Sequence, residues 1–227
     1  MKIEILDEVG STNDYIKRYL SSGEDRIVVA KRQTGGKGTK GRSFLSNEGG
    51  VYLSALRFFS RFPARDAFRI MQHAAVAVCR TVESYGVKAQ IKWSNDVLVN
   101  GKKIAGILIE NGFSGSNLVN SVVGIGLNVQ NDLGELSDIA VNLNDAAGRE
   151  LPFGEVRDRL IRNFCDTDWL QSEEMYRERV LLGRITVTER ENSYVATARR
   201  VLDDGRLEIE CEGEVRALSA AEISVKY

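Results

Sequence analysis

The sequence has few residues of the kinds that build metal centres or cross-links, and it has no long apolar run. Its 227 residues include 3 cysteines, 2 prolines and 1 histidine. The cysteines are scattered without CxxC spacing, which argues against a thiolate metal site or a disulfide framework. No apolar stretch approaches the roughly 18 residues of a membrane-spanning helix, and the N-terminus has no apolar signal-peptide core. These absences favour a cytoplasmic protein that does not bind membranes.

A strong net charge is also missing. The chain has 31 basic and 32 acidic residues, for a formal charge of −1. This balance gives no broad positive field of the kind that draws proteins to nucleic acid, so we expect no DNA partner. The length and the 43% apolar content suffice for one larger domain and a small one.

Glycine and basic residues are instead concentrated in one segment, residues 31–54, KRQTGGKGTKGRSFLSNEGGVYLS. Glycines let a backbone approach a ligand closely, and Lys37, Lys40 and Arg42 can stabilise anionic oxygens. The spacing matches neither the Walker A loop nor the GxGxxG loop. The pattern predicts a phosphate-handling loop, with a solvated flexible turn as the alternative.

A second segment, KWSNDVLVNGKKIAGILIEN, carries polar residues on a predicted hairpin. Two runs rich in strand-forming residues flank an Asn-Gly pair, the strongest short hairpin dipeptide. Pairing of the two arms brings Lys92, Asn95 and Asp96 near Lys103. A cation, an amide and a carboxylate then converge, although an ordinary amphipathic hairpin with a solvated tip would show the same pattern.

The remaining periodicity predicts an α+β protein, with a mixed sheet covered by helices rather than a doubly wound parallel sheet. Expected strands are 2–6, 26–31, 51–58 and 118–129, and expected helices are a capped one that ends near Gly23, then 64–85, 153–164 and 169–180. From Gly183 the pattern changes to short alternating strands, at 185–190, 194–202, 207–211, 215–220 and 222–227. We therefore expect a larger domain, 1–182, followed by a small β-barrel domain, 183–227.

Five ordered motifs carry a family resemblance. They are GSTND (10–14), QTGGKGTKGRSFLS (33–46), KWSNDV (92–97), GKKIAGILIE (101–110) and GIGLNV (124–129). Together they resemble biotin protein ligases, also called biotin–acetyl-CoA-carboxylase ligases, over nearly the whole chain. The resemblance implies a class II synthetase-like catalytic domain, a C-terminal SH3-like barrel, and a form without the N-terminal DNA-binding domain that some members carry. Because members often dimerise through sheet edges, it also leaves a homodimer as one option.

The family activity implied is ATP-dependent. Biotin is activated as biotinyl-5′-AMP with MgATP and is then transferred to a lysine of a biotin carboxyl carrier protein. The implied catalytic residues are Lys103 and Arg42. The implied biotin-binding residues are Ser11, Thr12, Asn13, Gln33, Lys37, Gly38, Lys103 and Gly106. The implied ATP-binding residues are Thr39, Lys40, Arg42, Trp93, Asn95, Asp96 and Asn128, with Asp96 also a contact for Mg²⁺.

Some of these residues also have ordinary structural interpretations. Ser11 and Thr12 could simply cap a helix, Trp93 could pack in the core, and Asn128 could end a strand. The chain also departs from the family pattern, with Thr39 at a loop position where the family has arginine, Phe44 in place of tryptophan and Ser94 in place of proline. The loss of an arginine removes a charge-assisted contact worth about 1.5 to 3 kcal/mol unless Lys40 replaces it.

Two other functions remain open from the sequence. The first is a lipoate or octanoate ligase or transferase of related fold, although its usual RRxSGGG motif is absent. The second is a catalytically weak biotin- or nucleotide-binding protein, which the departure at Thr39 would favour.

Overall fold

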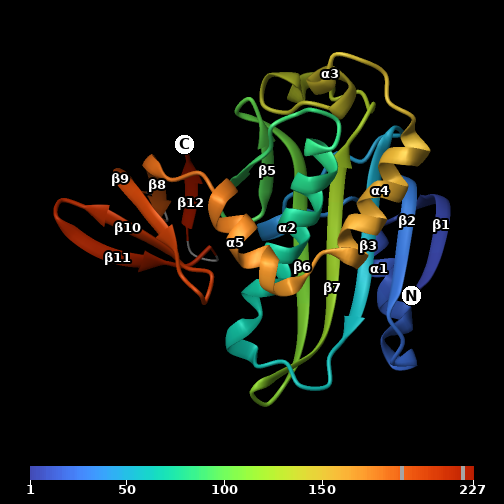
Figure 1. Ribbon diagram of the computed structural model, residues 1–227, viewed down its shortest axis with the longest axis horizontal. Coiled ribbons are helices and arrows are strands. Elements are labelled where there is room, and N and C mark those ends of the chain that lie inside the picture. The colour runs from blue at the N-terminus through green and yellow to red at the C-terminus, as the bar shows by residue number, and fades with distance from the viewer. Residues whose placement is uncertain (190–191, 221–222) are drawn as a thin grey trace.

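A seven-stranded mixed sheet forms the centre of the molecule (Figure 1). The structure is a computed structural model that describes residues 1–189, 192–220 and 223–227. The strands are β1 (Lys2–Val9), β2 (Arg26–Gln33), β3 (Gly50–Phe58), β4 (Gln90–Lys92), β5 (Asp96–Val99), β6 (Lys102–Ser114) and β7 (Asn117–Asn128). Their order across the sheet is β1-β2-β3-β7-β6-β5-β4. Only β1 and β2 pair in parallel, and the other neighbours are antiparallel.

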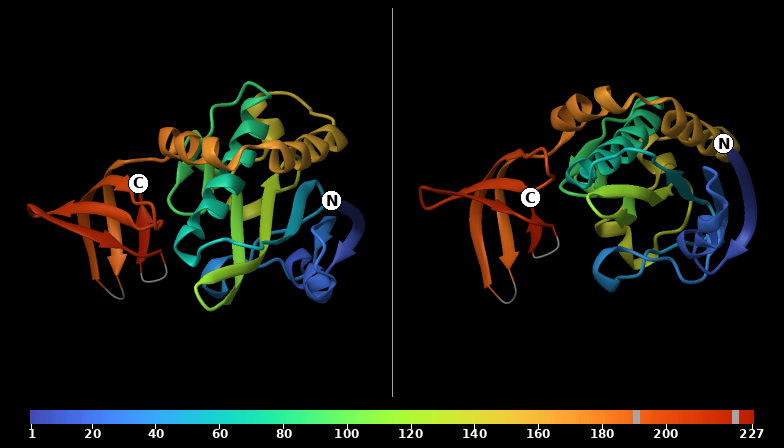
Figure 2. Two further views of the ribbon diagram at one scale, coloured as in Figure 1. Left: turned by 60° about the horizontal axis from the view of Figure 1, so that its bottom comes forward. Right: turned by 90° about the horizontal axis from the view of Figure 1, so that it is seen from below.

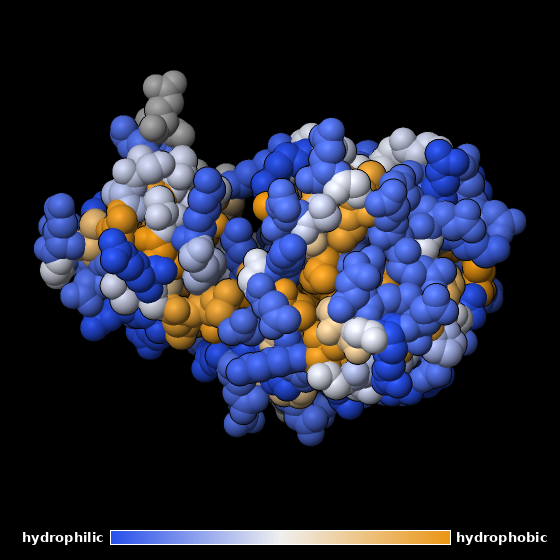
Figure 3. All heavy atoms as spheres, turned by 90° about the horizontal axis from the view of Figure 1, so that it is seen from above, coloured by the Kyte–Doolittle hydropathy of each residue, from blue (hydrophilic) through white to orange (hydrophobic). Residues whose placement is uncertain are grey.

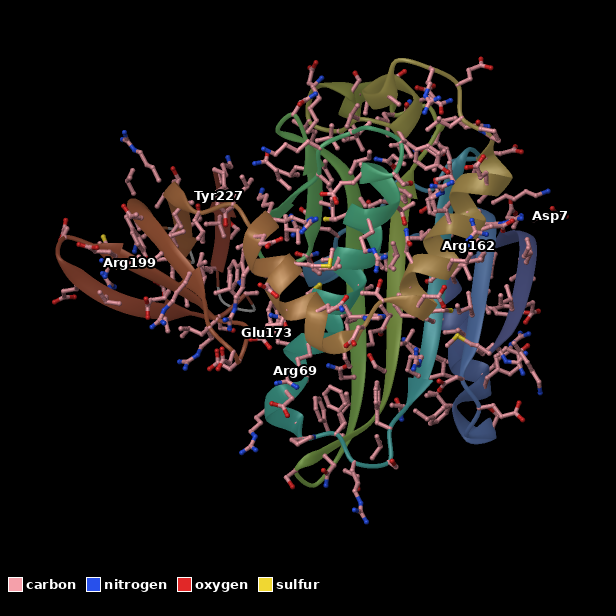
Figure 4. All side chains as sticks on the ribbon, viewed as in Figure 1. Asp7, Arg69, Arg162, Glu173, Arg199 and Tyr227 are labelled. Carbon is pink, nitrogen blue, oxygen red and sulfur yellow. The ribbon has the colours of Figure 1, made fainter. Side chains whose placement is uncertain are left out.

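Three helices cover one face of this sheet (Figure 2): α2 (Phe68–Glu83), α4 (Phe153–Asp166) and α5 (Trp169–Arg179). Apolar residues of α2 recur every three to four positions and are fully buried, which joins the helix to the main hydrophobic core. Arg69 of α2 and Glu173 of α5 lie next to each other at the surface (Figure 4), with 4.0 Å between Nη2 and Oε2. This helical layer leaves the opposite sheet face for other elements.

That opposite face carries α1 (Thr12–Ile16), which continues as a 3₁₀ helix, η1 (Lys17–Ser22). Ile16 packs with Val28, Leu56 and Val122 in a small separate cluster. The glycine-basic loop, which contains the short η2 (Thr39–Gly41), crosses the same face. The remaining short elements are η3 (Ala64–Asp66), η4 (Gly134–Asp138) and α3 (Leu143–Ala147).

The C-terminal part forms a separate five-stranded antiparallel sheet, in the order β11-β10-β9-β8-β12. Its strands are β8 (Gly183–Glu189), β9 (Asn192–Val201), β10 (Leu207–Cys211), β11 (Glu214–Leu218) and β12 (Ile223–Lys226). Within the described residues β11 and β12 are not paired, so the expected barrel is an open sheet there. Residues 190 and 222, which end and begin two predicted strands, lie outside the described residues.

The mixed α+β architecture is confirmed, and three local predictions need correction. The long helix starts at Phe68 rather than residue 64, because Ala64–Asp66 forms a 3₁₀ turn. The predicted two-armed hairpin is a three-stranded meander, with Lys92 on a strand of its own. Ser11 occupies the N-cap position of α1, but its side chain makes no capping hydrogen bond.

The surface seen in Figure 3 is mostly hydrophilic, with apolar residues exposed in separate patches. In the described part of the chain, no helix is both long and apolar enough to cross a membrane.

Candidate functional site

A cleft with an empty volume of about 720 Å³ opens on the sheet face that α1 and the glycine-basic loop share. Most of the predicted site residues line it. They are Ser11, Thr12, Asn13, Gln33, Lys37, Gly38, Thr39, Arg42, Asn95, Asp96, Lys103 and Gly106. These side chains come from both ends of the seven-stranded sheet and meet only because the loop folds over the central strands.

The floor of the cleft is made of glycines on β6 and β7. Gly106 and Gly126 are directly opposed in the sheet, and Gly124 lies two residues before Gly126. A Cβ atom added at Gly106 would lie 3.0 Å from the Lys103 ammonium and from the Phe44 ring. A Cβ at Gly126 would be 2.5 Å from Phe44. Only glycine leaves room here for the side chains that form the walls.

Neutral polar side chains form one end of the cleft. The Gln33 Oε1 atom accepts hydrogen bonds from the Thr12 backbone N–H (2.7 Å) and from its hydroxyl (2.9 Å). The Ser54 hydroxyl lies 2.8 Å from Thr12 Oγ1 and 2.6 Å from Asn13 Oδ1. Gln33 Nε2 in turn donates to Ser46 Oγ at 2.9 Å. These partners fix the side-chain orientations in advance of any ligand, which suits recognition of a neutral polar ring.

Charged groups form the other end. The Lys103 ammonium lies 2.7 Å from Asp96 Oδ1, and Gly106 leaves space for it because it has no side chain. The Lys103 backbone is held on both sides, since its N–H donates to Ile139 O and its carbonyl accepts from the Val141 N–H, each at 2.9 Å. The ammonium also lies 5.5 Å from the centroid of the Phe44 ring. A fixed cation therefore faces the cleft from a rigid strand.

A second cleft, with an empty volume of about 570 Å³, lies between the loop and the C-terminal sheet. Lys40, Arg42 and Trp93 line it, together with Lys92 and residues of β12. Trp93 Nε1 donates to Gly205 O at 2.9 Å, so this indole joins the two sheets. Burial is the main cause that lowers the Lys92 pKa, and nearby Lys103, Arg42 and Lys226 lower it further. Such a concentration of cations is suited to binding an anion.

The loop cations differ in what they contact. Lys40 Nζ donates to the Ile223 carbonyl of β12 at 2.6 Å, which directs this ammonium toward the C-terminal sheet. Arg42 folds back on the loop, where Nε lies 3.3 Å from Thr39 O and Nη2 lies 3.2 Å from Thr39 Oγ1. Lys37 forms an ion pair of 2.6 Å with Asp14, which lowers the Asp14 pKa through that hydrogen bond. Among the described contacts of these three cations, Arg42 is thus the one that reaches Thr39.

One predicted residue lies apart from the others. Asn128 lines neither cleft, and its buried amide contacts Asn131 Nδ2 at 3.2 Å and Val141 O at 3.4 Å. Sequence reasoning also missed a residue, Ser54, which is fully buried between Thr12 and Asn13. Its only signal in the sequence is a hydroxyl within the otherwise apolar run VYLSAL, and strands often tolerate such a residue without any role.

Comparisons with known proteins agree with this geometry. The model of the Biotin/lipoate A/B protein ligase family matches residues 6–128. The bifunctional ligase/repressor BirA of Bacillus subtilis is 40% identical over 134 residues, which is 56% of this chain but only 41% of that protein. A biotin–[acetyl-CoA-carboxylase] ligase of Mycobacterium tuberculosis is 27% identical across 98% of this chain and 88% of its own length. Biotin protein ligase from Aquifex aeolicus, solved with biotin and ATP, superposes with a TM-score of 0.78 at 25% identity, over 99% of this chain and 98% of that one.

Proposed function

Because the chain belongs to the Biotin/lipoate A/B protein ligase family, we propose that it is an ATP-dependent biotin protein ligase. It activates biotin as biotinyl-5′-AMP and transfers the biotinyl group to a lysine of a biotin carboxyl carrier protein. The observation that supports this most directly is the position of Lys103, whose ammonium stands between a neutral polar pocket and a cation-lined cleft.

The first step brings two anions together. A biotin carboxylate oxygen attacks the α-phosphorus of ATP, the new P–O bond forms, and the bond to pyrophosphate breaks with its electron pair on the leaving group. Negative charge grows on the phosphoryl oxygens and on pyrophosphate, so fixed cations stabilise the transition state. In the second step an acceptor lysine amine attacks the biotinyl carbonyl, AMP leaves with its electron pair, and the amine loses a proton.

The two clefts bind different parts of the substrates. The neutral end, with Thr12 and Gln33, holds the uncharged ureido ring, whose recognition needs a few fixed hydrogen-bonding groups. Lys103 neutralises the carboxylate and the α-phosphate between them. Arg42, which can grip phosphate oxygens bidentately, binds the triphosphate from the second cleft. Asn128 lines neither cleft, and its predicted contact with ATP stays a prediction.

Mg²⁺ would be held mainly by the phosphates of ATP, with few protein ligands. Among the residues that the structure describes, no group of three or more His, Cys, Asp or Glu side chains gathers to hold an ion. Mg²⁺ commonly binds through one or two carboxylates, phosphates and water, and Asp96, which lines both clefts, would be such a carboxylate. The ion would supply charge neutralisation on the phosphates.

The C-terminal sheet supports a division into a catalytic domain, 1–182, and an SH3-like domain, 183–227. The first strand of that sheet begins at Gly183, and within the described residues its five antiparallel strands pair with one another and not with the seven-stranded sheet. Contacts such as the Lys40 bond to β12 let the second domain form one wall of the ATP cleft.

Mass spectrometry tests the proposed activity. An acceptor domain incubated with the protein, biotin and MgATP should gain the mass of one biotinyl group on one lysine. An unchanged mass would contradict the ligase assignment and leave a binding protein. Replacing biotin by lipoate in an ATP–pyrophosphate exchange assay separates the related activity, since we expect exchange to depend on biotin and not on lipoate.

A further inference from the structure

Glu110 lies beyond the cleft, on β6, yet its carboxylate reaches back to the first turn of α1. Its Oε2 accepts a hydrogen bond of 2.9 Å from Asn13 Nδ2, and its Oε1 lies 2.7 Å from the Lys17 ammonium. Neither Glu110 nor Lys17 lines either of the two clefts. The contact joins α1 to a strand 97 residues away in the chain.

The contact also fixes which way the Asn13 amide points. An ionised carboxylate only accepts hydrogen bonds, so the amide nitrogen must face Glu110. The amide oxygen then faces the Ser54 hydroxyl at 2.6 Å. Below it, a Cβ at Gly124 would collide with this same oxygen. Asn13 is 4% exposed, so a flipped or displaced amide would leave buried polar atoms unpaired.

Asn13 is linked in turn to the polar end of the cleft. The chain neighbour of Asn13 is Thr12, whose N–H and hydroxyl both bond Gln33. Ser54 contacts Thr12 as well as Asn13. A shift of Asn13 therefore moves the groups that we assign to the ureido ring. Lys103 shares β6 with Glu110, but its ammonium pairs with Asp96 on β5 and makes no described contact with Asn13, Thr12 or Gln33.

We infer that Glu110 is a positioning residue that sets the affinity for biotin by holding Asn13, and through it Thr12, over the glycine floor. The inference rests on the proposed function for the identity of the ligand. The Lys17 ion pair is secondary, because the two side chains are 34% and 38% exposed and pairs of that kind contribute little.

Three variants test the inference: Glu110→Ala, Glu110→Gln and Lys17→Met. Biotin affinity is measured by titration calorimetry, and the KM for ATP is measured by pyrophosphate exchange. Glu110→Ala removes the acceptor, so biotin should bind about tenfold more weakly while the KM for ATP stays within about twofold. Glu110→Gln keeps an oxygen acceptor at the same distance, and Lys17→Met keeps the carboxylate, so both should stay within about threefold of the parent.

An affinity of Glu110→Ala within twofold of the parent would overturn the inference. A parallel rise in the KM for ATP, or an equal loss in Glu110→Gln, would also overturn it, because either result indicates general damage to the fold. A parent protein that binds biotin but catalyses no exchange would contradict the proposed function, and the calorimetric pattern among the variants would still decide the role of Glu110. A parent that does not bind biotin would contradict both.

Discussion

The two faces of the central sheet are built from the same strands and carry opposite kinds of side chain. On the helical face lie Leu53, Ile107 and Ile125, which are almost completely buried in the main core. On the cleft face lie the residues next to them in sequence, such as Ser54 and Gly106. Because side chains alternate along a strand, the central strands β3, β6 and β7 pack into the main core on one face and lie at the cleft on the other. Beside the cleft, Val28, Leu56 and Val122 still pack under α1.

The difference between the faces shows how the fold compensates for the destabilising glycines on the cleft face. Glycine within a strand destabilises it by roughly 0.5 to 1 kcal/mol and packs nothing. The cleft face has three such glycines in β6 and β7, whereas the helical face buries a continuous layer of aliphatic residues under α2, α4 and α5. The helical layer offsets the cost of the cleft, so we expect substitutions on the two faces to affect different measurements.

The largest effect is expected for Lys103→Ala on the cleft side. Loss of a preorganised charged donor costs on the order of 3 kcal/mol or more, so biotin-dependent pyrophosphate exchange should fall by roughly 10² to 10³. The unfolding free energy should change little, because the Lys103 backbone keeps its hydrogen bonds to Ile139 and Val141.

The neighbouring lysine gives a matched control. Lys102 is exposed and bonds only the Ser137 carbonyl at 2.7 Å among the described contacts, so Lys102→Ala should retain exchange. Exchange within threefold of the parent in Lys103→Ala would show that the ammonium is not catalytic.

Adjacent residues of β3 allow the comparison to be made within one strand. Leu53→Ala should lower the unfolding free energy by about 2 to 5 kcal/mol through loss of buried contacts, with the biotin affinity of the folded protein nearly unchanged. Ser54→Ala should weaken biotin binding about tenfold and cost only about 1 kcal/mol of stability. Chemical denaturation and biotin titration of both variants test this. Equal changes in both measurements for the two variants would mean that the faces are not separable.

Thr39 tests whether the departure from the family pattern has a consequence. The structure directs Lys40 to β12, and among the described loop cations Arg42 is the one that contacts Thr39. Thr39 itself carries no charge where the family has arginine. A charge-assisted contact is worth about 1.5 to 3 kcal/mol, so Thr39→Arg should release biotinyl-AMP about tenfold more slowly or slower still. Release can be followed by trapping free intermediate after a single turnover. Equal release rates would refute a retaining role for this position.

Much of the fold and part of the candidate site could be predicted from local sequence patterns. The Asn-Gly turn, the glycine-basic loop and the change of pattern at Gly183 all depend on neighbouring residues, and each lies where it was expected. These features follow from backbone preferences that act over a few residues.

The features that could not be predicted depend on distant contacts. The role of Ser54 depends on α1, and the position of Lys40 depends on β12, which is 183 residues further along the chain. The separate strand of Lys92 follows from pairing with β5, whereas the sequence alone allowed one continuous arm. The lack of pairing between β11 and β12 within the described residues is likewise a property of pairing geometry and not of any residue pattern.

The smallest effect is expected from a change in pH. It should act on the unfolding free energy through His73, which lies on the helical face. His73 on α2 is completely buried, its Nε2 lies 2.7 Å from the Phe164 carbonyl, and burial lowers its pKa to about 4. The unfolded chain, with a histidine pKa near 6.5, takes up the proton first as the pH falls. The stability that depends on neutral His73 is therefore complete above about pH 6.5 and is lost progressively as the pH falls toward 4.

Between pH 7 and about pH 5.5 the His73 contribution should fall by about 1 kcal/mol. Because the sequence contains only 1 histidine, His73→Gln should flatten the stability profile in this window, and the carboxylates that titrate below it serve as an internal reference. Denaturant titrations at a series of pH values measure both proteins. If the parent and the variant lost stability in parallel, the helical face would have no pH dependence of its own.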